Sequence, residues 1–187
     1  PLIMITSVFA GMVLVVQVGK QFLDLKAETF IGGTVGLSLA RELGPLLTAL
    51  VVAGRIGSAI AAELGTMKVT EQVDALVVMA TNPVGYLVVP RVLACSLMVP
   101  CLTVIADAIG IVGGAVVAIW QIRISMDTFT KSIIDWVSYD DVASGVVKAL
   151  IFGFIIAIIA CYKGLTTSGG AEGVEHFAAK IETGRPS

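Results

Sequence analysis

The chain has 187 residues, of which 57% are hydrophobic and 14% are charged, and its mean hydropathy is +0.97. This composition is too apolar for a water-soluble domain of this size and indicates an all-α, polytopic membrane protein. The net charge of −2 provides no basic surface for nucleic acid. Because the chain starts at Pro1 inside an apolar run, we expect a fragment of a longer protein.

The first apolar stretch, residues 2–18, has no charge and predicts the remainder of a first membrane span. A cleaved signal peptide is the competing interpretation, but its basic start and small-residue cleavage site are not visible. Residues 20–31 mix charges with large apolar groups and predict a short loop or interfacial turn. A ladder of small residues at every fourth position then indicates close helix packing, and it consists of Gly32, Gly36, Ala40 and Gly44.

Arg41 and Glu42 form an adjacent charged pair just before Gly44-Pro45. Pro45 suits a first helical turn, so the sequence predicts a helix break beside the two charges. Such a break is costly in lipid unless it lines a cavity. One hypothesis is that Arg41 and Glu42 line the mouth of a lipid-binding cavity, with Arg41 facing a phosphate. The alternative is an interfacial pair that anchors the helix end.

The next apolar segment, residues 43–62, has the length of a membrane-crossing helix and contains a single charge, Arg55. Small residues recur along it at every fourth position, among them Ala53, Gly57 and Ala61. Such a stripe lets helices approach closely in lipid. It serves either packing within one chain or the seam of a symmetric dimer.

Charges gather in residues 63–82, a region that we interpret as containing a short amphipathic helix between two spans. Thr70 is the predicted cap, and Glu71, Gln72 and Asp74 fill the first turn, where the negative charges of Glu71 and Asp74 suit the helix dipole. Apolar side chains at i, i+3, i+4 and i+7 form the opposite stripe, namely Val73, Leu76, Val77 and Ala80. Asn82-Pro83 ends this helix, whose acidic face is expected to face water.

Residues 84–122 contain only two charges, Arg91 and Asp107, and their length predicts more than one span. The sequence therefore predicts two helices or a broken hairpin, divided near Pro100 or Asp107. Asp107 at membrane depth is a functional candidate. The three cysteines, Cys95, Cys101 and Cys161, lie in apolar runs and are interpreted as packing residues, with neither a disulfide nor a metal site expected.

Residues 121–141 form the longest polar connection and are expected on the side opposite the acidic helix. Residues 142–162 predict another span, interrupted only by Lys148. Lys148 either extends its amine to the interface or provides a second cationic contact for a phospholipid headgroup. The tail, residues 163–187, is polar and glycine-rich and contains the single histidine, His176.

Nothing in the sequence supplies chemistry or energy of its own. The glycine-rich stretches GGTVG and GGAEG lack the lysine and hydroxyl of a phosphate-binding loop, and no catalytic or metal motif is present. We therefore expect no cofactor, no metal and no catalytic residue. An ATP-driven activity would need a separate ATPase.

The run RELGPLLTALVVAGRIGSAIAAELGTMKVTEQVDAL, residues 41–76, closely resembles the signature of the MlaE-type (YrbE-like) permeases. These are the membrane subunits of ABC transporters that move phospholipid between membranes. The resemblance extends from about Ile5 to about Val174 and recurs at Pro90-Arg91 and at SGGAEGV, residues 168–174. It implies a single permease domain over residues 1–187, with a further C-terminal span missing, so that about five membrane segments are present.

The resemblance also implies roles and partners. Residues 63–82 would contain a cytoplasmic coupling helix that contacts an ABC ATPase, and the basic residue Lys148 would contact lipid. The coupling residues would be Glu71, Gln72, Asp74, Val73 and Leu76. It further implies a homodimer in the inner membrane, an MCE-domain partner and a small STAS-like cytoplasmic subunit. Basic residues agree weakly with this orientation, since six lie near the coupling-helix side and four near the other.

Two alternatives to the transporter remain at this stage. One is an intramembrane lipid-modifying enzyme centred on Arg41, Glu42 and Asp107, which requires these groups to converge. The other is an assembly scaffold without a substrate.

Overall fold

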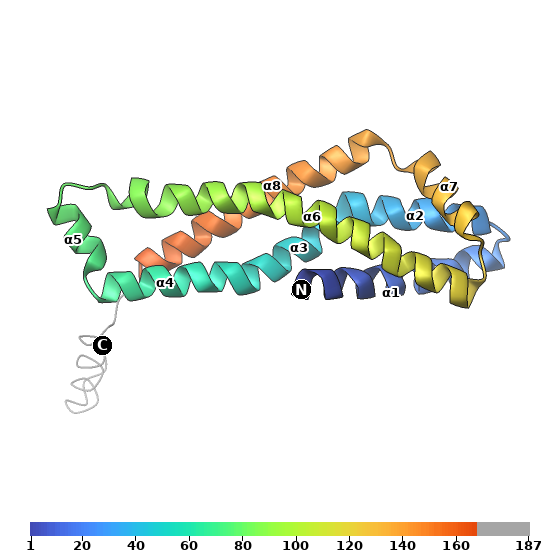
Figure 1. The fold of residues 1–187 in the computed structure, drawn as a ribbon, viewed down its shortest axis with the longest axis horizontal. Coiled ribbons are helices and arrows are strands. Elements are labelled where there is room, and N and C mark those ends of the chain that lie inside the picture. Colours follow the sequence, from blue (N-terminus) through green and yellow to red (C-terminus); the bar gives the residue numbers. More distant parts are fainter. Residues whose placement is uncertain (168–187) are drawn as a thin grey trace, which may run out of the picture.

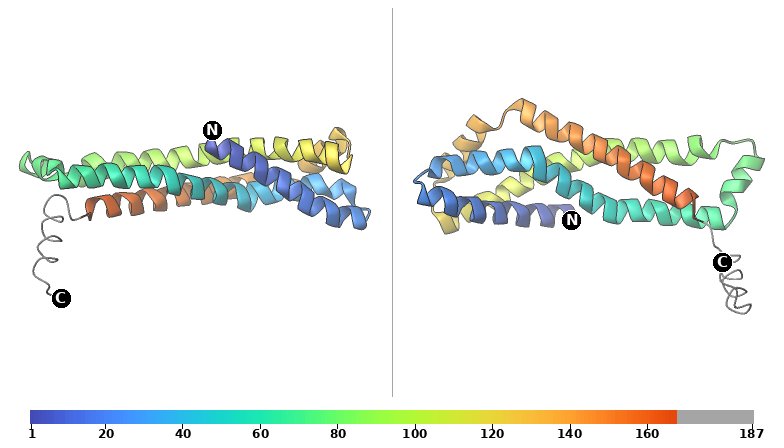
Figure 2. Two further views of the ribbon diagram at one scale, coloured as in Figure 1. Left: turned by 90° about the horizontal axis from the view of Figure 1, so that it is seen from below. Right: turned by 180° about the vertical axis from the view of Figure 1, so that it is seen from behind.

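The computed structural model describes residues 1–167, and every secondary-structure element in this part is a helix. The helices form a long, flat bundle (Figures 1 and 2). The all-α prediction is therefore confirmed. The predictions that concern SGGAEGV, His176, most of the polar tail and a missing last span lie outside the described residues.

The first helix, α1 (Leu2–Asp24), contains the predicted first span and continues past Lys20. A turn and a short 3-10 helix, η1 (Glu28–Phe30), follow. The predicted interfacial turn is thus shorter than residues 20–31, since its first part extends α1.

A single continuous helical rod follows, about 63 Å long at 1.5 Å per residue, because it covers the 42 residues Glu28–Val69. Two π-helical turns interrupt its α-helical pattern. Its segments are α2 (Ile31–Ser38), η2 (Leu39–Leu43), α3 (Gly44–Val52), η3 (Ala53–Gly57) and α4 (Ser58–Val69). The predicted break at Gly44-Pro45 is wrong. Pro45 does begin α3, but the π turn η2 accommodates its missing N–H and the rod continues.

The acidic segment forms α5 (Gln72–Val78), which crosses from the rod to the next long helix at one end of the bundle (Figure 1). That helix consists of η4 (Val84–Val88), α6 (Val89–Val117) and η5 (Ala118–Ile122). The predicted division of residues 84–122 is wrong, because Pro100 lies buried inside α6 without ending it. Neighbouring helices support a proline in such a position.

The polar connection contains an unpredicted helix, α7 (Met126–Trp136), at the end of the bundle opposite α5 (Figure 1). Ser125 caps it by accepting a hydrogen bond from the Thr128 N–H at 3.2 Å. The last described helix, α8 (Tyr139–Leu165), runs back toward the α5 end. Within residues 1–167, four helices are long and apolar enough to cross a membrane, against the expected five or so for the whole chain.

Small residues set the distances between the helices. Close approaches join α1 to α6, where a Cβ at Gly114 would lie 3.2 Å from the Gly11 carbonyl oxygen. The predicted ladder on the rod also marks close contacts: Gly32 and Gly36 meet α7, Ala40 meets α8, and Gly44 meets α6. An unpredicted ladder buries one face of α8 and consists of Gly145, Ala149, Gly153 and Ala157.

Candidate functional site

Four charged side chains meet where the π turn η2 faces the first turns of α8. Lys148 Nζ donates to Glu42 Oε1 at 2.8 Å and to the Arg41 carbonyl oxygen at 2.9 Å. Arg41 Nε lies 3.6 Å from Asp141 Oδ1. We call Arg41, Glu42, Asp141 and Lys148 the polar cluster. The structure therefore brings together the three lipid-binding candidates predicted from the sequence and adds Asp141.

The backbone around Pro45 explains why Lys148 binds at this place. In a regular α-helix the N–H of residue 45 would donate to the Arg41 carbonyl, but proline has no N–H. Lys148 donates to that carbonyl instead. Gly145, one turn earlier on α8, allows the approach, because a Cβ there would collide with the Ala40 carbonyl oxygen and lie 3.5 Å from Pro45 Cγ.

Asp141 has two structural roles. Its Oδ2 accepts from the Ser138 N–H at 3.0 Å, which completes a capping box at the start of α8. Its Oδ1 faces Arg41. The sequence offered a signal that was missed, since Ser138 followed three residues later by an acidic residue marks a helix start.

The polar cluster is open to its surroundings on one side. The side chains of Glu42, Arg41 and Lys148 are 71%, 51% and 40% exposed, whereas that of Asp141 is 16% exposed. Exposed cations and carboxylates on helices of membrane-spanning length can exchange partners with a charged ligand.

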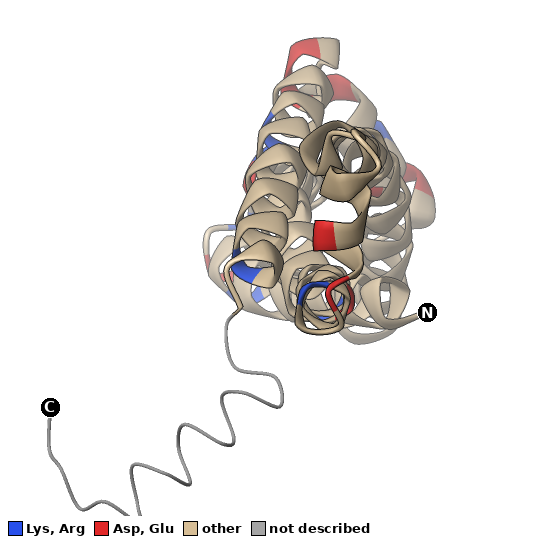
Figure 3. Cartoon of the chain, turned by 90° about the vertical axis from the view of Figure 1, so that its left-hand side faces the viewer, with Lys and Arg blue, Asp and Glu red and all other residues tan. Residues whose placement is uncertain are grey.

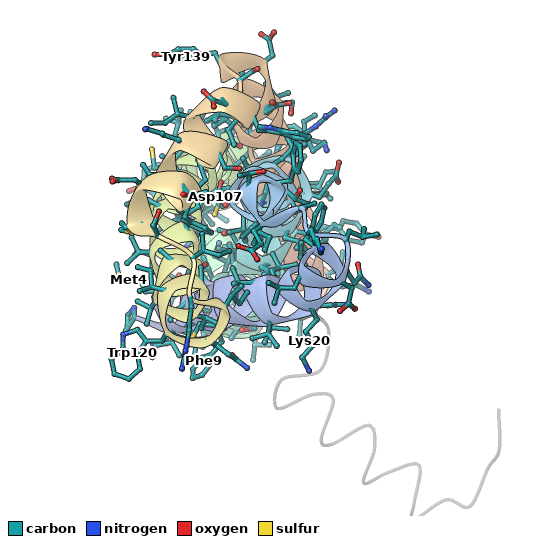
Figure 4. All side chains as sticks on the ribbon, turned by 90° about the vertical axis from the view of Figure 1, so that its right-hand side faces the viewer. Met4, Phe9, Lys20, Asp107, Trp120 and Tyr139 are labelled. Atoms are coloured by element: carbon teal, nitrogen blue, oxygen red, sulfur yellow. The ribbon has the colours of Figure 1, made fainter. Side chains whose placement is uncertain are left out.

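Asp107 lies inside the bundle and apart from these ion pairs. Figure 4 shows it between the helices, whereas Phe9, Trp120 and Tyr139 project outward. Its carboxylate packs against Gly44, and its buried Oδ1 has no hydrogen-bond partner in the structure. No hydrogen bond or ion pair joins Asp107 to Arg41, Glu42 or Lys148 among the described residues. The convergence that a lipid-modifying centre requires is thus not observed.

The α5 end contains the predicted coupling residues. Glu71, at φ 58°, turns the chain sharply between α4 and α5, and Gln72 begins α5. Asp74 accepts from Lys68 Nζ at 2.8 Å, which ties α5 to α4. Thr70 does not cap α5, because its hydroxyl donates back to the Thr66 carbonyl at 2.8 Å. Figure 3 views the bundle from this end, where acidic and basic residues both occur.

The apolar stripe of α5 only partly matches the prediction. Val73 is buried and Leu76 is half-buried against the core, as a stripe toward the bundle requires. Val77 is exposed, and Ala80 lies beyond the helix end. As a result, the tip of α5 presents three apolar side chains to the outside, namely Val77, Val78 and Met79.

The predicted small-residue seam lines a groove of about 330 Å³ between the rod and α8. Ala53, Gly57 and Ala61 all contribute to it, and Ile156 and Ile159 lie on the opposite side. The stripe also packs within the chain, since a Cβ at Gly57 would touch Ile156 at 3.4 Å.

One further ion pair was not predicted from the sequence. Arg91 Nη2 lies 2.8 Å from Glu63 Oε1 and links α6 to α4 near the α5 end. Their separation of 28 positions along the chain gave no local signal. Within residues 1–167, no three metal-ligating side chains gather into a possible metal site.

Comparison with known proteins agrees with this architecture. The family model described as Permease MlaE matches residues 1–180. A probable ABC transporter permease protein of Synechocystis is 51% identical over 171 residues, which cover 91% of this chain and 65% of that relative. A protein of the same description from Rickettsia typhi is 48% identical over 93% of this chain and 67% of its own length.

A third relative, a probable ABC transporter permease protein of Porphyra purpurea, is 43% identical over 91% of this chain and 65% of its own length. The chain thus spans about two thirds of the length of the relatives it matches. The match to the family model covers nearly the whole chain, and the four long apolar helices fit a multi-pass membrane protein. The chain belongs to the MlaE permease family.

Proposed function

We propose that this chain is the permease subunit of an ABC transporter that moves phospholipid between the inner and outer membranes and so maintains outer-membrane lipid asymmetry. The protein resides in the inner membrane, and a separate subunit hydrolyses ATP. The observation that carries this proposal is the polar cluster, which holds two cations and two carboxylates on helices of membrane-spanning length. Such charges in a membrane protein serve a polar substrate or its path.

The arrangement of α5 supports coupling to an ATPase. This helix joins the rod to the helix Val84–Ile122, and these are the two longest helices of the described residues. A displacement of α5 therefore acts on both. The Lys68–Asp74 ion pair and the buried Val73 fix α5 to the bundle. Meanwhile Val77, Val78 and Met79 are 57%, 86% and 68% exposed, which provides an apolar surface for a soluble partner.

The functional complex contains further proteins under this proposal. Two copies of the chain form a homodimer, and the groove lined by Ala53, Gly57 and Ala61 receives the second copy. An MCE-domain protein binds at the α7 end, and a small STAS-like subunit binds at the α5 side. A Gly54→Cys variant tests the dimer, because this glycine is exposed and an added Cβ meets nothing within 4 Å. Failure of two copies to cross-link at position 54 would place the dimer contact elsewhere.

Co-purification of the full-length protein from its membranes tests the coupling role of α5. We expect Val78→Asp, and the double reversal Glu71→Lys and Asp74→Lys, to lose the ATPase and keep bound lipid. Ile134→Asp is the matched control, because Ile134 is 72% exposed on α7 at the opposite end. ATPase retained by both α5 variants would show that docking lies elsewhere. If the unmutated protein bound no ATPase, the transporter proposal would fail.

A lipid-modifying enzyme is the weaker candidate. It requires Asp107 to act with Arg41 and Glu42, but Asp107 packs against Gly44 and makes no polar contact with either residue. Membership in a permease family also favours transport. We therefore propose no catalytic residue and no cofactor for this chain.

A further inference from the structure

The charges of the polar cluster balance one another. Two cations, Arg41 and Lys148, face two carboxylates, Glu42 and Asp141. A purely anionic ligand would add a negative charge beside two carboxylates, and this repulsion is strong where water is scarce. A ligand that carries both signs keeps the balance.

Arg41 retains hydrogen-bonding capacity for an anion. Its Nε lies 3.6 Å from Asp141 Oδ1, which is too long for a hydrogen bond. Within residues 1–167 no hydrogen bond engages its terminal nitrogens, and the side chain is half exposed. A guanidinium in this state suits bidentate binding of a phosphate.

Glu42 retains capacity for a cation. One of its oxygens, Oε1, accepts from Lys148, and its side chain is the most exposed of the four at 71%. The second oxygen has no partner among the described residues, so it remains open to an ammonium group.

Lys148 is already engaged by groups of its own chain. Its amine already donates to the Glu42 carboxylate and to the Arg41 carbonyl. It thereby fixes the Glu42 side chain relative to the Arg41 backbone. Lys148 is accordingly a positioning residue for the other two.

We propose that the polar cluster selects a zwitterionic phospholipid headgroup, with the phosphate on Arg41 and a protonated amine on Glu42. Phosphatidylethanolamine has this chemistry, whereas phosphatidylglycerol lacks the amine. The inference rests on the proposed phospholipid transport and adds the headgroup class. A charged hydrogen bond to the amine gives a preference of about tenfold for the zwitterionic lipid.

The test uses the full-length protein in nanodiscs that contain equal amounts of phosphatidylethanolamine and phosphatidylglycerol, with bound lipid measured by native mass spectrometry. We expect the unmutated protein to bind phosphatidylethanolamine about tenfold in excess. Glu42→Gln should reduce this excess to near equality while lipid stays bound, and Glu42→Asp should preserve it. Glu63→Gln is the matched control, because it also removes an exposed carboxylate from an ion pair, with Arg91.

The outcomes separate the inference from the proposed function. Equal binding of both lipids by the unmutated protein, with loss of lipid in Arg41→Gln, would overturn the headgroup preference and keep the lipid site. Unchanged lipid binding in Arg41→Gln would remove Arg41 as the phosphate contact and with it the proposed lipid site. An effect of Glu63→Gln equal to that of Glu42→Gln would show a general charge effect and overturn the selective role of Glu42.

Discussion

Gly145→Ala is the change that most directly tests the contact between α8 and the π turn η2. A Cβ at this position collides with the Ala40 carbonyl oxygen, which belongs to the backbone and cannot rotate away. The helices must therefore separate. Lys148 then loses its short contacts with Glu42 and the Arg41 carbonyl, since both depend on this approach.

The expected cost follows from the overpacked contact. Overpacking a close contact costs roughly 1–3 kcal/mol, and the exposed ion pairs of the polar cluster add little to it. The free energy of unfolding should thus fall by about 1–3 kcal/mol, which corresponds to a decrease in melting temperature of roughly 2–12 °C.

The measurement is a thermal unfolding scan of the detergent-purified protein, together with bound lipid. Gly85→Ala is the matched control, because Gly85 also lies in a helical turn but an added Cβ there meets nothing within 4 Å. Alanine at that exposed position should stabilise the protein by up to about 1 kcal/mol. Equal melting temperatures for the two variants, with lipid retained in both, would refute the argument that α8 must approach this closely.

Two further predictions concern backbone groups. Pro45→Ala supplies an N–H that can donate to the Arg41 carbonyl and so competes with Lys148 for it. We expect unchanged or higher thermal stability and weaker lipid binding. A loss of thermal stability would contradict this account. Ser132→Ala removes the hydroxyl that accepts from the buried Gly33 N–H at 2.8 Å. The free energy of unfolding should fall by about 1–3 kcal/mol. Amide hydrogen exchange at Gly33 should become faster, and unchanged exchange would contradict the role given to this hydrogen bond.

Over residues 32–44 the small-residue spacing predicted close packing correctly but not the partners. A glycine or alanine at every fourth position flattens one helix face whatever lies opposite, so the pattern carries no information about the neighbour. On the rod, Gly36 meets α7 whereas Gly44, two turns later, meets α6. The partner changes because helices cross at an angle, and crossing angles depend on the whole topology.

The breaks predicted at prolines failed for a physical reason that applies to both cases. Proline removes one backbone hydrogen bond, and in water this loss often ends a helix. In the bundle the missing bond is tolerated, since a π turn precedes Pro45 and close neighbours bury Pro100. Pro45 therefore marked a local irregularity in the rod, but neither Pro45 nor Pro100 marked the end of a helix.

The candidate site was predicted in part because charges are rare in this chain. Arg41, Glu42 and Lys148 stood out against apolar surroundings, and the structure brings them together. Asp141 did not stand out, because it lies in a polar connection among other acidic residues. Its contact with Arg41 spans 100 positions in the chain and depends on how α8 crosses the rod.

The two ends of α8 connect the polar cluster with the region of α5. Near its start, Gly145 packs against Ala40 beside the cluster; near its end, a Cβ at Gly164 would lie 2.9 Å from the Ala61 carbonyl oxygen on α4. Between these contacts Ala149 of α8 belongs to the same buried apolar cluster as Val52 of the rod, and the groove at Gly57 lies on the α5 side of this cluster. The helix α8 therefore contacts the rod near the polar cluster, at its middle and near α5. Under the proposed function, a displacement of α5 passed to α4 would reach α8 at Gly164, and the same helix holds Lys148 at its other end.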